Sequence, residues 1–370
     1  MKTKTKYPTT ILLTRAAVAF AVAIFALAGS VRAATIERGG DISEYTIEQQ
    51  LGTVFHDAKG NALSDPLTLC QTNGWTVARI RLFVNPPMTG VEVNTLSYAV
   101  TQAVKAKQRG MKILLDIHYS DNWDNPGYHN TPAAWQGQTY SQLLTTVSNY
   151  TVTVMRTFIS SNVTPSFVQI GNEVGDGFLF PTGGPISFTN GVPGPSTQWS
   201  QFVGLIKAGI SGAKAVSPTT KIMIHIPGGD WSSWCTEYFD AFTTACTNFD
   251  LIGVSYYPYL LGSEASDLSA ITATLNALHN RYSGKKLWIA EFSYAWNWGV
   301  SNGPVYWNTP TGQYQITRDL CNLVSSYSDG GGVCYWGVFF VDNPSLSYNW
   351  EARCLFDYPN HWALPAWGGL

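Results

Sequence analysis

The sequence predicts a single (β/α)8 barrel, on the basis of three observations. Short apolar segments typical of strands alternate with longer amphipathic segments typical of helices, from about residue 36 to the C-terminus. The strand segments are apolar almost throughout, as in a parallel sheet that is covered on both faces. Eight such units in about 335 residues fit a closed barrel better than an open sheet.

Seven apolar segments are predicted strands, and an eighth, GGDISEY at 39–45, is a candidate at the start of the chain. The seven are 76–84, 112–119, 167–173, 221–226, 250–257, 286–294 and 332–340. No G-x-G-x-x-G or G-x-x-x-x-G-K turn follows an early strand, which disfavours an open nucleotide-binding sheet.

The segments between the strands repeat apolar residues at helical spacing. In 95–110, Leu96, Val100 and Val104 share one face, and Gly110 is a signal for the helix C-terminus. The other predicted helices lie in 140–160, 196–216, 267–284 and 311–331. Because no linker or repeat interrupts 35–370, we expect one domain there.

Composition and charge restrict the function. Only 12% of the residues are charged and the net charge is −2, so no basic field attracts nucleic acid or an anionic membrane. Aromatic residues reach 14%, including 14 Trp and 19 Tyr. Their flat apolar faces with a polar edge suit sugar rings, although a large aromatic core is the alternative explanation.

The N-terminus is predicted to be a secretory signal in residues 1–33. Four basic residues precede or flank the apolar segment 16–29, which is shorter than the ~20 residues of a membrane span. Cleavage is expected after Ala33 or Ala34, and an uncleaved anchor is the alternative. We therefore expect a secreted or periplasmic protein.

The six cysteines are interpreted in that oxidising setting. They allow fifteen pairings, among which the sequence cannot choose, and Cys235 with Cys246 makes the easiest short loop. No C-x-x-C is present, so a zinc site is not expected. No metal and no cofactor are predicted, and the protein is expected to be a monomer.

Polar or aromatic side chains stand at the C-terminal end of nearly every predicted strand. Barrel enzymes build their sites from these ends and the loops that follow them. The residues are Arg79, Arg81, Asp116, His118, Asp121, Asn172, Glu173, His225, Tyr256, Tyr257, Glu291 and Trp336.

Two of these residues, Glu173 and Glu291, are carboxylates on the fourth and seventh strands. These strands face each other across a barrel mouth, and opposed carboxylates suit glycoside hydrolysis, in which one is a protonated acid and the other an anion. A separation of about 5 to 5.5 Å makes the reaction retaining. Asn172 can then hydrogen-bond the sugar 2-hydroxyl.

Several segments resemble family 53 glycoside hydrolases, the endo-β-1,4-galactanases. They include RIRLFVNPP, LLDIHYSDNWDNPG, VQIGNEVGDGFLFPTGG, KIMIHIPGGDW and FDLIGVSYYPY, in order along the chain. The resemblance implies that Glu173 is the acid/base, that Glu291 is the nucleophile, and that Arg81 pairs with the nucleophile and keeps it ionised. Arg79 is expected to be exterior or structural, on the reasoning that alternate strand residues point in opposite directions.

The strand ends and the resemblance together predict the substrate-binding residues. These are Arg81, Asp116, His118, Asp121, Trp123, Asn172, His225, Asp230, Trp231, Tyr257 and Trp336. Trp123 is expected to stack on a galactosyl face, and Trp336 to lie under the sugar at the cleavage point. Tyr256 is expected to pack in the core.

The sequence therefore predicts a secreted retaining endo-glycosidase that hydrolyses β-1,4-galactosidic bonds in galactan and arabinogalactan side chains of pectin. It departs from the family at Phe180, where Trp is usual, at Gly337, where Glu is usual, and in a Gly/Pro-rich insertion at 184–199. These departures leave two alternatives open: a relative that acts on another β-linked polysaccharide such as mannan or xylan, and a carbohydrate-binding barrel without activity.

Overall fold

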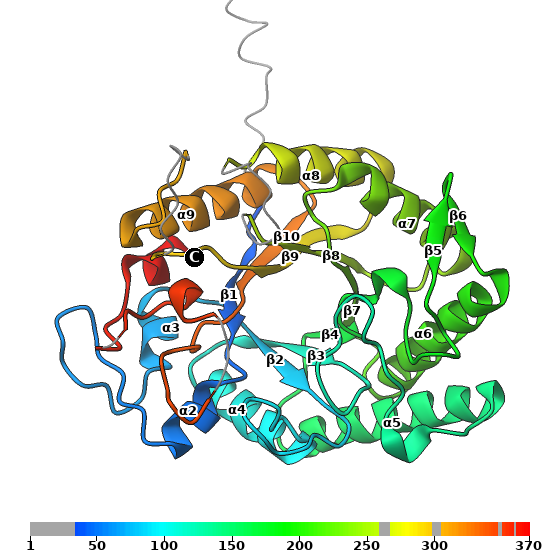
Figure 1. Ribbon diagram of the computed structural model, residues 1–370, viewed down its shortest axis with the longest axis horizontal. Helices are drawn as coiled ribbons and strands as arrows, with labels where there is room; N and C mark the ends of the chain where they lie inside the picture. Colours follow the sequence, from blue (N-terminus) through cyan, green and yellow to red (C-terminus); the bar gives the residue numbers. More distant parts are fainter. Residues whose placement is uncertain (1–33, 259–266, 298–304, 347–349, 359) are drawn as a thin grey trace, which may run out of the picture. The chain divides into compact units, whose positions relative to one another are not determined.

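The computed structural model describes residues 34–258, 267–297, 305–346, 350–358 and 360–370. Its centre is a closed barrel of eight parallel strands, in the order β1-β10-β9-β8-β7-β4-β3-β2 (Figure 1). The strands are β1 (Glu37–Asp41), β2 (Val77–Leu82), β3 (Lys112–Ile117), β4 (Phe167–Ile170), β7 (Lys221–Ile226), β8 (Leu251–Tyr256), β9 (Lys286–Phe292) and β10 (Gly330–Tyr335). The predicted barrel is confirmed.

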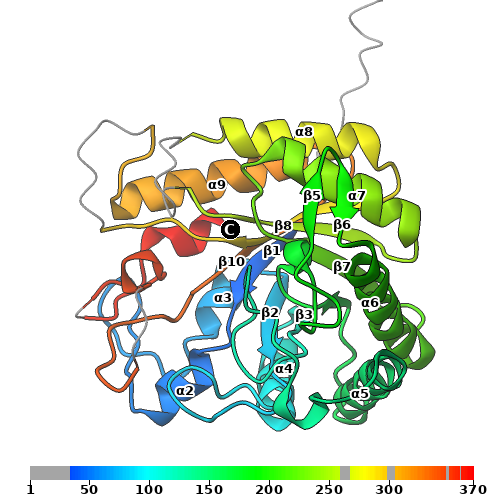
Figure 2. The ribbon, with the colours of Figure 1, turned by 45° about the vertical axis from the view of Figure 1, so that its right-hand side comes forward.

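Helices surround the barrel and cover its outer face (Figure 2). They are α2 (Tyr45–Gln50), α3 (Thr68–Thr72), α4 (Leu96–Gln108), α5 (Tyr140–Ser160), α6 (Ser196–Val216), α7 (Ser232–Ala245), α8 (Ser269–Arg281) and α9 (Pro310–Ser326). The start of α5 is fixed by a capping box, in which the Thr139 side chain accepts a hydrogen bond from the backbone N–H of Gln142 and the Gln142 side-chain oxygen accepts one from the backbone N–H of Thr139.

All the barrel strands except β7 end earlier than the segments that predicted them. The segment 39–45 is strand only to Asp41, and after a turn the chain enters α2. The insertion at 184–199 contains an antiparallel pair, β5 (Ser187–Thr189) and β6 (Val192–Gly194), that the sequence did not predict. Phe188 of this pair packs on Trp199 and Tyr238 of the neighbouring helices, with ring centroids 5.8 and 5.9 Å away.

A small apolar cluster fills the inside of the barrel and is separate from the core between strands and helices. We call it the interior cluster; it consists of Val77, Leu114, Met223, Leu251, Trp288, Ala290 and Cys334. Trp288 has room because glycines face it: a Cβ at Gly331 or Gly332 would lie 2.2 or 2.6 Å from its ring atoms. The polar residues at the strand ends therefore lie next to a layer of apolar side chains inside the barrel.

All six cysteines are buried and free, so the short-loop pair Cys235–Cys246 is wrong. Cys235 is in the first turn of α7 and Cys246 follows its last residue. At 1.5 Å per residue the helix holds them about 16 Å apart, far beyond the roughly 7 Å that a disulfide spans between Cα atoms.

No helix of the described part of the chain is both long and apolar enough to cross a bilayer. The predicted signal segment, 1–33, lies outside the described residues.

Candidate active site

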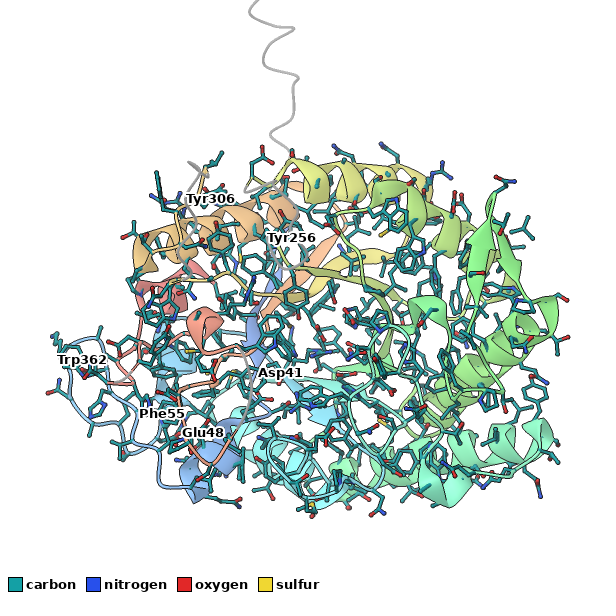
Figure 3. All side chains as sticks on the ribbon, viewed as in Figure 1. Asp41, Glu48, Phe55, Tyr256, Tyr306 and Trp362 are labelled. Carbon is teal, nitrogen blue, oxygen red and sulfur yellow. The ribbon has the colours of Figure 1, made fainter. Side chains whose placement is uncertain are left out.

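The polar residues of the barrel interior lie on the C-terminal side of the interior cluster. On β2, for example, Val77 belongs to that cluster and Arg79 and Arg81 follow on the same face, since residues two apart in a strand share a face. Asp41 at the end of β1 also points into the barrel interior (Figure 3). The site is therefore built where barrel enzymes bind their substrates.

The backbone after β4 turns sharply and positions Glu173. Gly171 has φ of +77°, and a Cβ there would lie 2.5 Å from the Val174 side chain. Glu173 itself is in the left-handed region, with φ of 47° and ψ of 43°. Such a conformation is costly for a non-glycine residue and is concentrated at functional sites. The apolar strand therefore ends in a turn that directs a carboxylate into the barrel mouth.

Glu173 is nearly buried, at 8% exposed, and its Oε1 lies 2.6 Å from the hydroxyl of Ser255. Burial and the charge of nearby Glu291 raise the pKa of Glu173 to about 8. Glu173 is thus protonated at neutral pH and can serve as an acid.

Glu291, at the end of β9, has contacts that favour its anion. Its Oε1 lies 2.7 Å from Nη2 of Arg79, and its Oε2 accepts a hydrogen bond of 2.5 Å from the Tyr257 hydroxyl. Burial raises the pKa of Glu291, while Arg79 and Tyr257 oppose that effect. Because no Lys, Arg or His of the described part of the chain forms an ion pair with Glu173, Glu291 is the member of the pair that ionises more readily.

The two carboxylates are close together. Ser255 Oγ lies 2.6 Å from Glu173 Oε1 and 3.5 Å from Glu291 Oε2, so these two oxygens are at most about 6 Å apart. Within that distance Glu291 is the more readily ionised of the two groups, and the spacing allows both to contact the same bond of a substrate.

The prediction that Arg81 pairs with the nucleophile is wrong, because Arg79 makes that contact. Arg79 also binds Asp41 and Asp116, each at 2.8 Å. Arg81 binds Glu44 at 2.6 Å instead, and its guanidinium lies 4.0 Å from the Trp123 ring centroid. The two arginines share a face and differ in position along the barrel axis, so the expected opposite orientation was also wrong.

Asp116 and His118 of β3 join the Arg79 network. Burial alone raises the pKa of Asp116, but Arg79 and His118 together hold it below its usual range. His118 Nε2 lies 3.0 Å from that carboxylate, and its Nδ1 accepts a hydrogen bond from the amide of Asp124. Asp116 and Glu291 therefore share Nη2 of Arg79, while Asp41 binds Nη1.

Aromatic side chains line the same mouth. Trp336 lies with its ring centroid 6.1 Å from Trp123, 6.3 Å from Tyr257 and 4.5 Å from Trp350. Trp123 is half-buried, with one face against Arg81. Tyr256, on the other face of β8, is buried and stacks on Phe292, as expected of a packing residue.

Three predicted substrate-binding residues have other surroundings. Asp121 uses both carboxylate oxygens to accept the amides of Asn85 and Ala133, so it holds two loops together. Asp230 and Trp231 are exposed in the loop after β7, where Trp231 is 62% exposed and stacks on Trp234. The structure does not bring these three into contact with the carboxylate pair.

Three residues of the network were missed by sequence reasoning: Asp41, Gln169 and Ser255. Gln169 donates to Asp116 and Asn172, at 2.6 and 3.0 Å. Each is a polar residue within or at the end of a buried strand, and Ser255 shares its face with Tyr257 two residues later. That pattern is the signal that could have identified them.

Within the described residues, no group of three or more His, Cys, Asp or Glu side chains is arranged to hold a metal ion.

The sequence model of glycosyl hydrolase family 53 matches residues 37–368. The chain belongs to glycosyl hydrolase family 53. It is 32% identical to a probable arabinogalactan endo-beta-1,4-galactanase A of Neosartorya fischeri, over 87% of this chain and 89% of that protein. It is 30% identical to the arabinogalactan endo-beta-1,4-galactanase of Thermothelomyces thermophilus, over 86% and 94% of the two chains.

Solved structures of the family agree. The GH53 catalytic domain of Ignisphaera aggregans superposes with a TM-score of 0.79 at 31% identity, covering 90% of this chain and 94% of that one. A solved structure from work on two fungal beta-1,4-galactanases superposes with a TM-score of 0.78 at 27% identity. The match covers 91% of this chain and 99% of that one. This family 53 member is a glycoside hydrolase, as the carboxylate pair predicted.

Proposed function

We propose that this family 53 hydrolase is a retaining endo-β-1,4-galactanase that acts on galactan and arabinogalactan side chains of pectin. The observation that carries the proposal is the carboxylate pair itself, with a neutral Glu173 and an Arg79-bound Glu291. The galactanases to which the chain is similar support the substrate class. The signal-like pattern in residues 1–33 supports action outside the cytoplasm.

The spacing of the pair supports retention of configuration. Retaining glycosidases hold their carboxyl groups about 5 to 5.5 Å apart, whereas inverting enzymes need about 6.5 to 9.5 Å to admit a water. Oxygens that are at most about 6 Å apart fit the first arrangement.

In the first step, Glu291 attacks the anomeric carbon and the bond to the leaving oxygen breaks. Glu173 donates its proton to that oxygen, so the leaving sugar departs as a neutral alcohol. Arg79 keeps Glu291 anionic before attack, and Tyr257 orients its second oxygen. The product is a glycosyl ester on Glu291.

In the second step, water attacks the anomeric carbon, the ester bond to Glu291 breaks and releases Glu291 as a carboxylate, and Glu173 takes up a proton from the water. The charge on Glu291 is absent from the ester, so the repulsion that helped to raise the pKa of Glu173 disappears. The pKa of Glu173 then falls, which prepares the same group to act as a base.

The sugar at the cleavage point would lie against Trp336, and its neighbour would stack on Trp123, with Asn172 near the 2-hydroxyl. Because Arg81 backs Trp123 at 4.0 Å, the ring has a fixed orientation before substrate arrives.

The test is Glu173→Gln with a panel of substrates. We expect hydrolysis of β-1,4-galactan to fall by orders of magnitude, by a reducing-sugar assay. Aryl glycosides with a good leaving group should still form the glycosyl-enzyme, because they need little protonation, and azide should restore turnover. Equal loss on both substrates without azide rescue would reject the acid/base role.

The unmutated enzyme is assayed on galactan, mannan and xylan in parallel. Release of reducing ends from mannan or xylan but not from galactan would reject the proposed substrate. Binding of a polymer without any release would instead identify a barrel that has lost catalysis.

A further inference from the structure

A continuous hydrogen-bond chain links Glu173 to Asn172 through Ser255 and His225. Glu173 Oε1 lies 2.6 Å from Ser255 Oγ, which lies 2.9 Å from His225 Nε2. On its other side, His225 Nδ1 lies 3.1 Å from Asn172 Oδ1 and 3.4 Å from the backbone nitrogen of Glu173. Ser255 and His225 are buried, at 3% and 0% exposed.

The amide of Asn172 has a defined orientation. Its Oδ1 accepts hydrogen bonds from Arg79 at 2.9 Å and Gln169 at 3.0 Å, and its Nδ2 donates to the carbonyl of Asp124 at 2.9 Å. The oxygen therefore faces His225, and it can accept from an Nδ1–H but cannot donate.

His225 is neutral in this site. Burial and the charge of Arg79 bring its pKa well below the usual value. A neutral imidazole carries one proton, on Nδ1 or on Nε2, so only two arrangements of the chain exist.

In the first arrangement Glu173 is protonated. Its O–H donates to Ser255 Oγ, the Ser255 hydroxyl donates to His225 Nε2, and His225 Nδ1–H donates to Asn172 Oδ1. Every side chain in the chain then has a partner of the correct type, whereas the backbone N–H of Glu173 faces Nδ1–H and does not donate to it.

In the second arrangement Glu173 is ionised. The Ser255 hydroxyl donates to the carboxylate, His225 Nε2–H donates to Ser255 Oγ, and the Glu173 backbone N–H donates to the bare Nδ1. This chain is also complete, and every hydrogen bond of Ser255 has reversed direction.

We propose that Ser255 and His225 form a reversible hydrogen-bond chain whose direction follows the protonation state of Glu173. They are positioning residues, since they act through Glu173 and need not touch the substrate. The inference rests on the proposed function in one respect: a retaining enzyme needs Glu173 in both protonation states during each turnover. A serine fits this position because a hydroxyl both donates and accepts.

Other charged or titratable groups face Glu173 and His225 from the surrounding strands and loops. They are Arg79, Asp116, His118, His129, Tyr257 and Glu291. None of them replaces Ser255 between the two residues, because the 2.6 and 2.9 Å contacts are both made by its single oxygen.

The direct test is the tautomer of His225, measured by 15N NMR on the full enzyme with labelled histidine. The protein has six histidines, and the His225 signals are assigned by their loss in His225→Asn. We expect the Nδ1–H form below the titration of Glu173, at about pH 8, and the Nε2–H form above it. One unchanged tautomer across that range, or an imidazolium, would overturn the proposal.

The second test compares Ser255→Ala with Ser255→Thr, which keeps the hydroxyl. Hydrogen bonds to a charged group are roughly twice as strong as neutral ones, so alanine destabilises the Glu173 anion more than the acid. We therefore expect the alkaline limb of the pH profile of kcat/KM to shift to higher pH by about half to one unit in S255A. In S255T this limb should remain at its original pH.

In S255A the tautomer of His225 should no longer change with the titration of Glu173. A downward shift of the limb, or a tautomer that still follows Glu173 in S255A, would remove Ser255 from the chain. These results are separable from the proposed function: azide rescue of E173Q tests the acid/base role even if the tautomer never changes, and the tautomer can follow Glu173 even if E173Q remains active.

Discussion

Arg79 is expected to control both the stability of the barrel and the ionisation of Glu291. The variant Arg79→Met tests these two roles, and comparison with Arg81→Met distinguishes the role of Arg79 from that of Arg81. Arg79 is 1% exposed and contacts three carboxylates: Asp41, Asp116 and Glu291. Removing one partner of a buried ion pair costs about 3 to 5 kcal/mol. With an unfolding entropy of about 2.1 cal/mol/K per residue over roughly 340 residues, Tm should fall by about 4 to 7 °C.

The same change should shift the acid limb of the pH profile. Arg79 favours the ionised form of Glu291, so its removal raises the pKa of Glu291 further, and the nucleophile is ionised only at higher pH. A nearby cation typically lowers a carboxylate pKa by about 1 to 3 units, so the acid limb of kcat/KM should move upward by a similar amount.

Arg81→Met is the matched control. Arg81 lies on the same strand, is equally buried and has its own carboxylate partner, Glu44. We expect a comparable loss of Tm and a higher KM, because the support of Trp123 is removed, but an acid limb at its original pH. An acid limb that moves in R81M and not in R79M would refute the assignment of Arg79 to the nucleophile.

Three further changes probe neighbouring contacts. Trp123→Ala should raise KM or lower kcat/KM on long galactan and retain the fold; a large drop in Tm with unchanged kinetics would make Trp123 a core residue. Tyr257→Phe removes a 2.5 Å hydrogen bond to Glu291, so kcat/KM should fall about tenfold or more, with an acid limb at higher pH; an unchanged profile would exclude this role. Burial alone lowers the pKa of His129, but the carboxylates of Asp124 and Asp176 raise it to about 9. The stabilisation of the fold by protonated His129 is complete below about pH 6.5 and is lost as pH rises through about 9. The Tm should therefore fall over that interval in the native enzyme and fall less in His129→Gln. Parallel curves of Tm against pH for the two proteins would contradict this role of His129.

The fold could be predicted because seven of the eight barrel strands carry their own apolar signal, whereas β1, with the sequence ERGGD, does not. β8 shows both the strength and the limit of that signal: LIGVSY is clearly a buried strand, and a polar residue within it marks Ser255 as a candidate site residue, but the sequence does not show that its hydroxyl contacts Glu173 and Glu291. The β5–β6 pair was missed because three-residue strands among glycine and proline have no measurable period.

The site could be predicted as a set of strand ends, but its pairings could not. All six residues of β2 are buried, so neither burial nor alternation distinguishes Arg79 from Arg81. Their roles differ because each arginine contacts the strand ends that lie at its own level along the barrel axis. Which strand ends those are depends on the stagger of the closed barrel. The disulfide expectation was wrong because α7, a helix that was not among those predicted from the sequence, separates Cys235 and Cys246.

The interior cluster also has a consequence for how this enzyme can change over generations or in the laboratory. Trp288 and the glycines Gly331 and Gly332 are complementary in size, so a smaller residue at 288 leaves a void and any side chain at 331 or 332 collides with the ring. Neither partner can be replaced alone, and compatible replacements must arise together. Variation in substrate preference is thereby directed to the loops at the opposite end of the strands, which is where a library of variants is best placed.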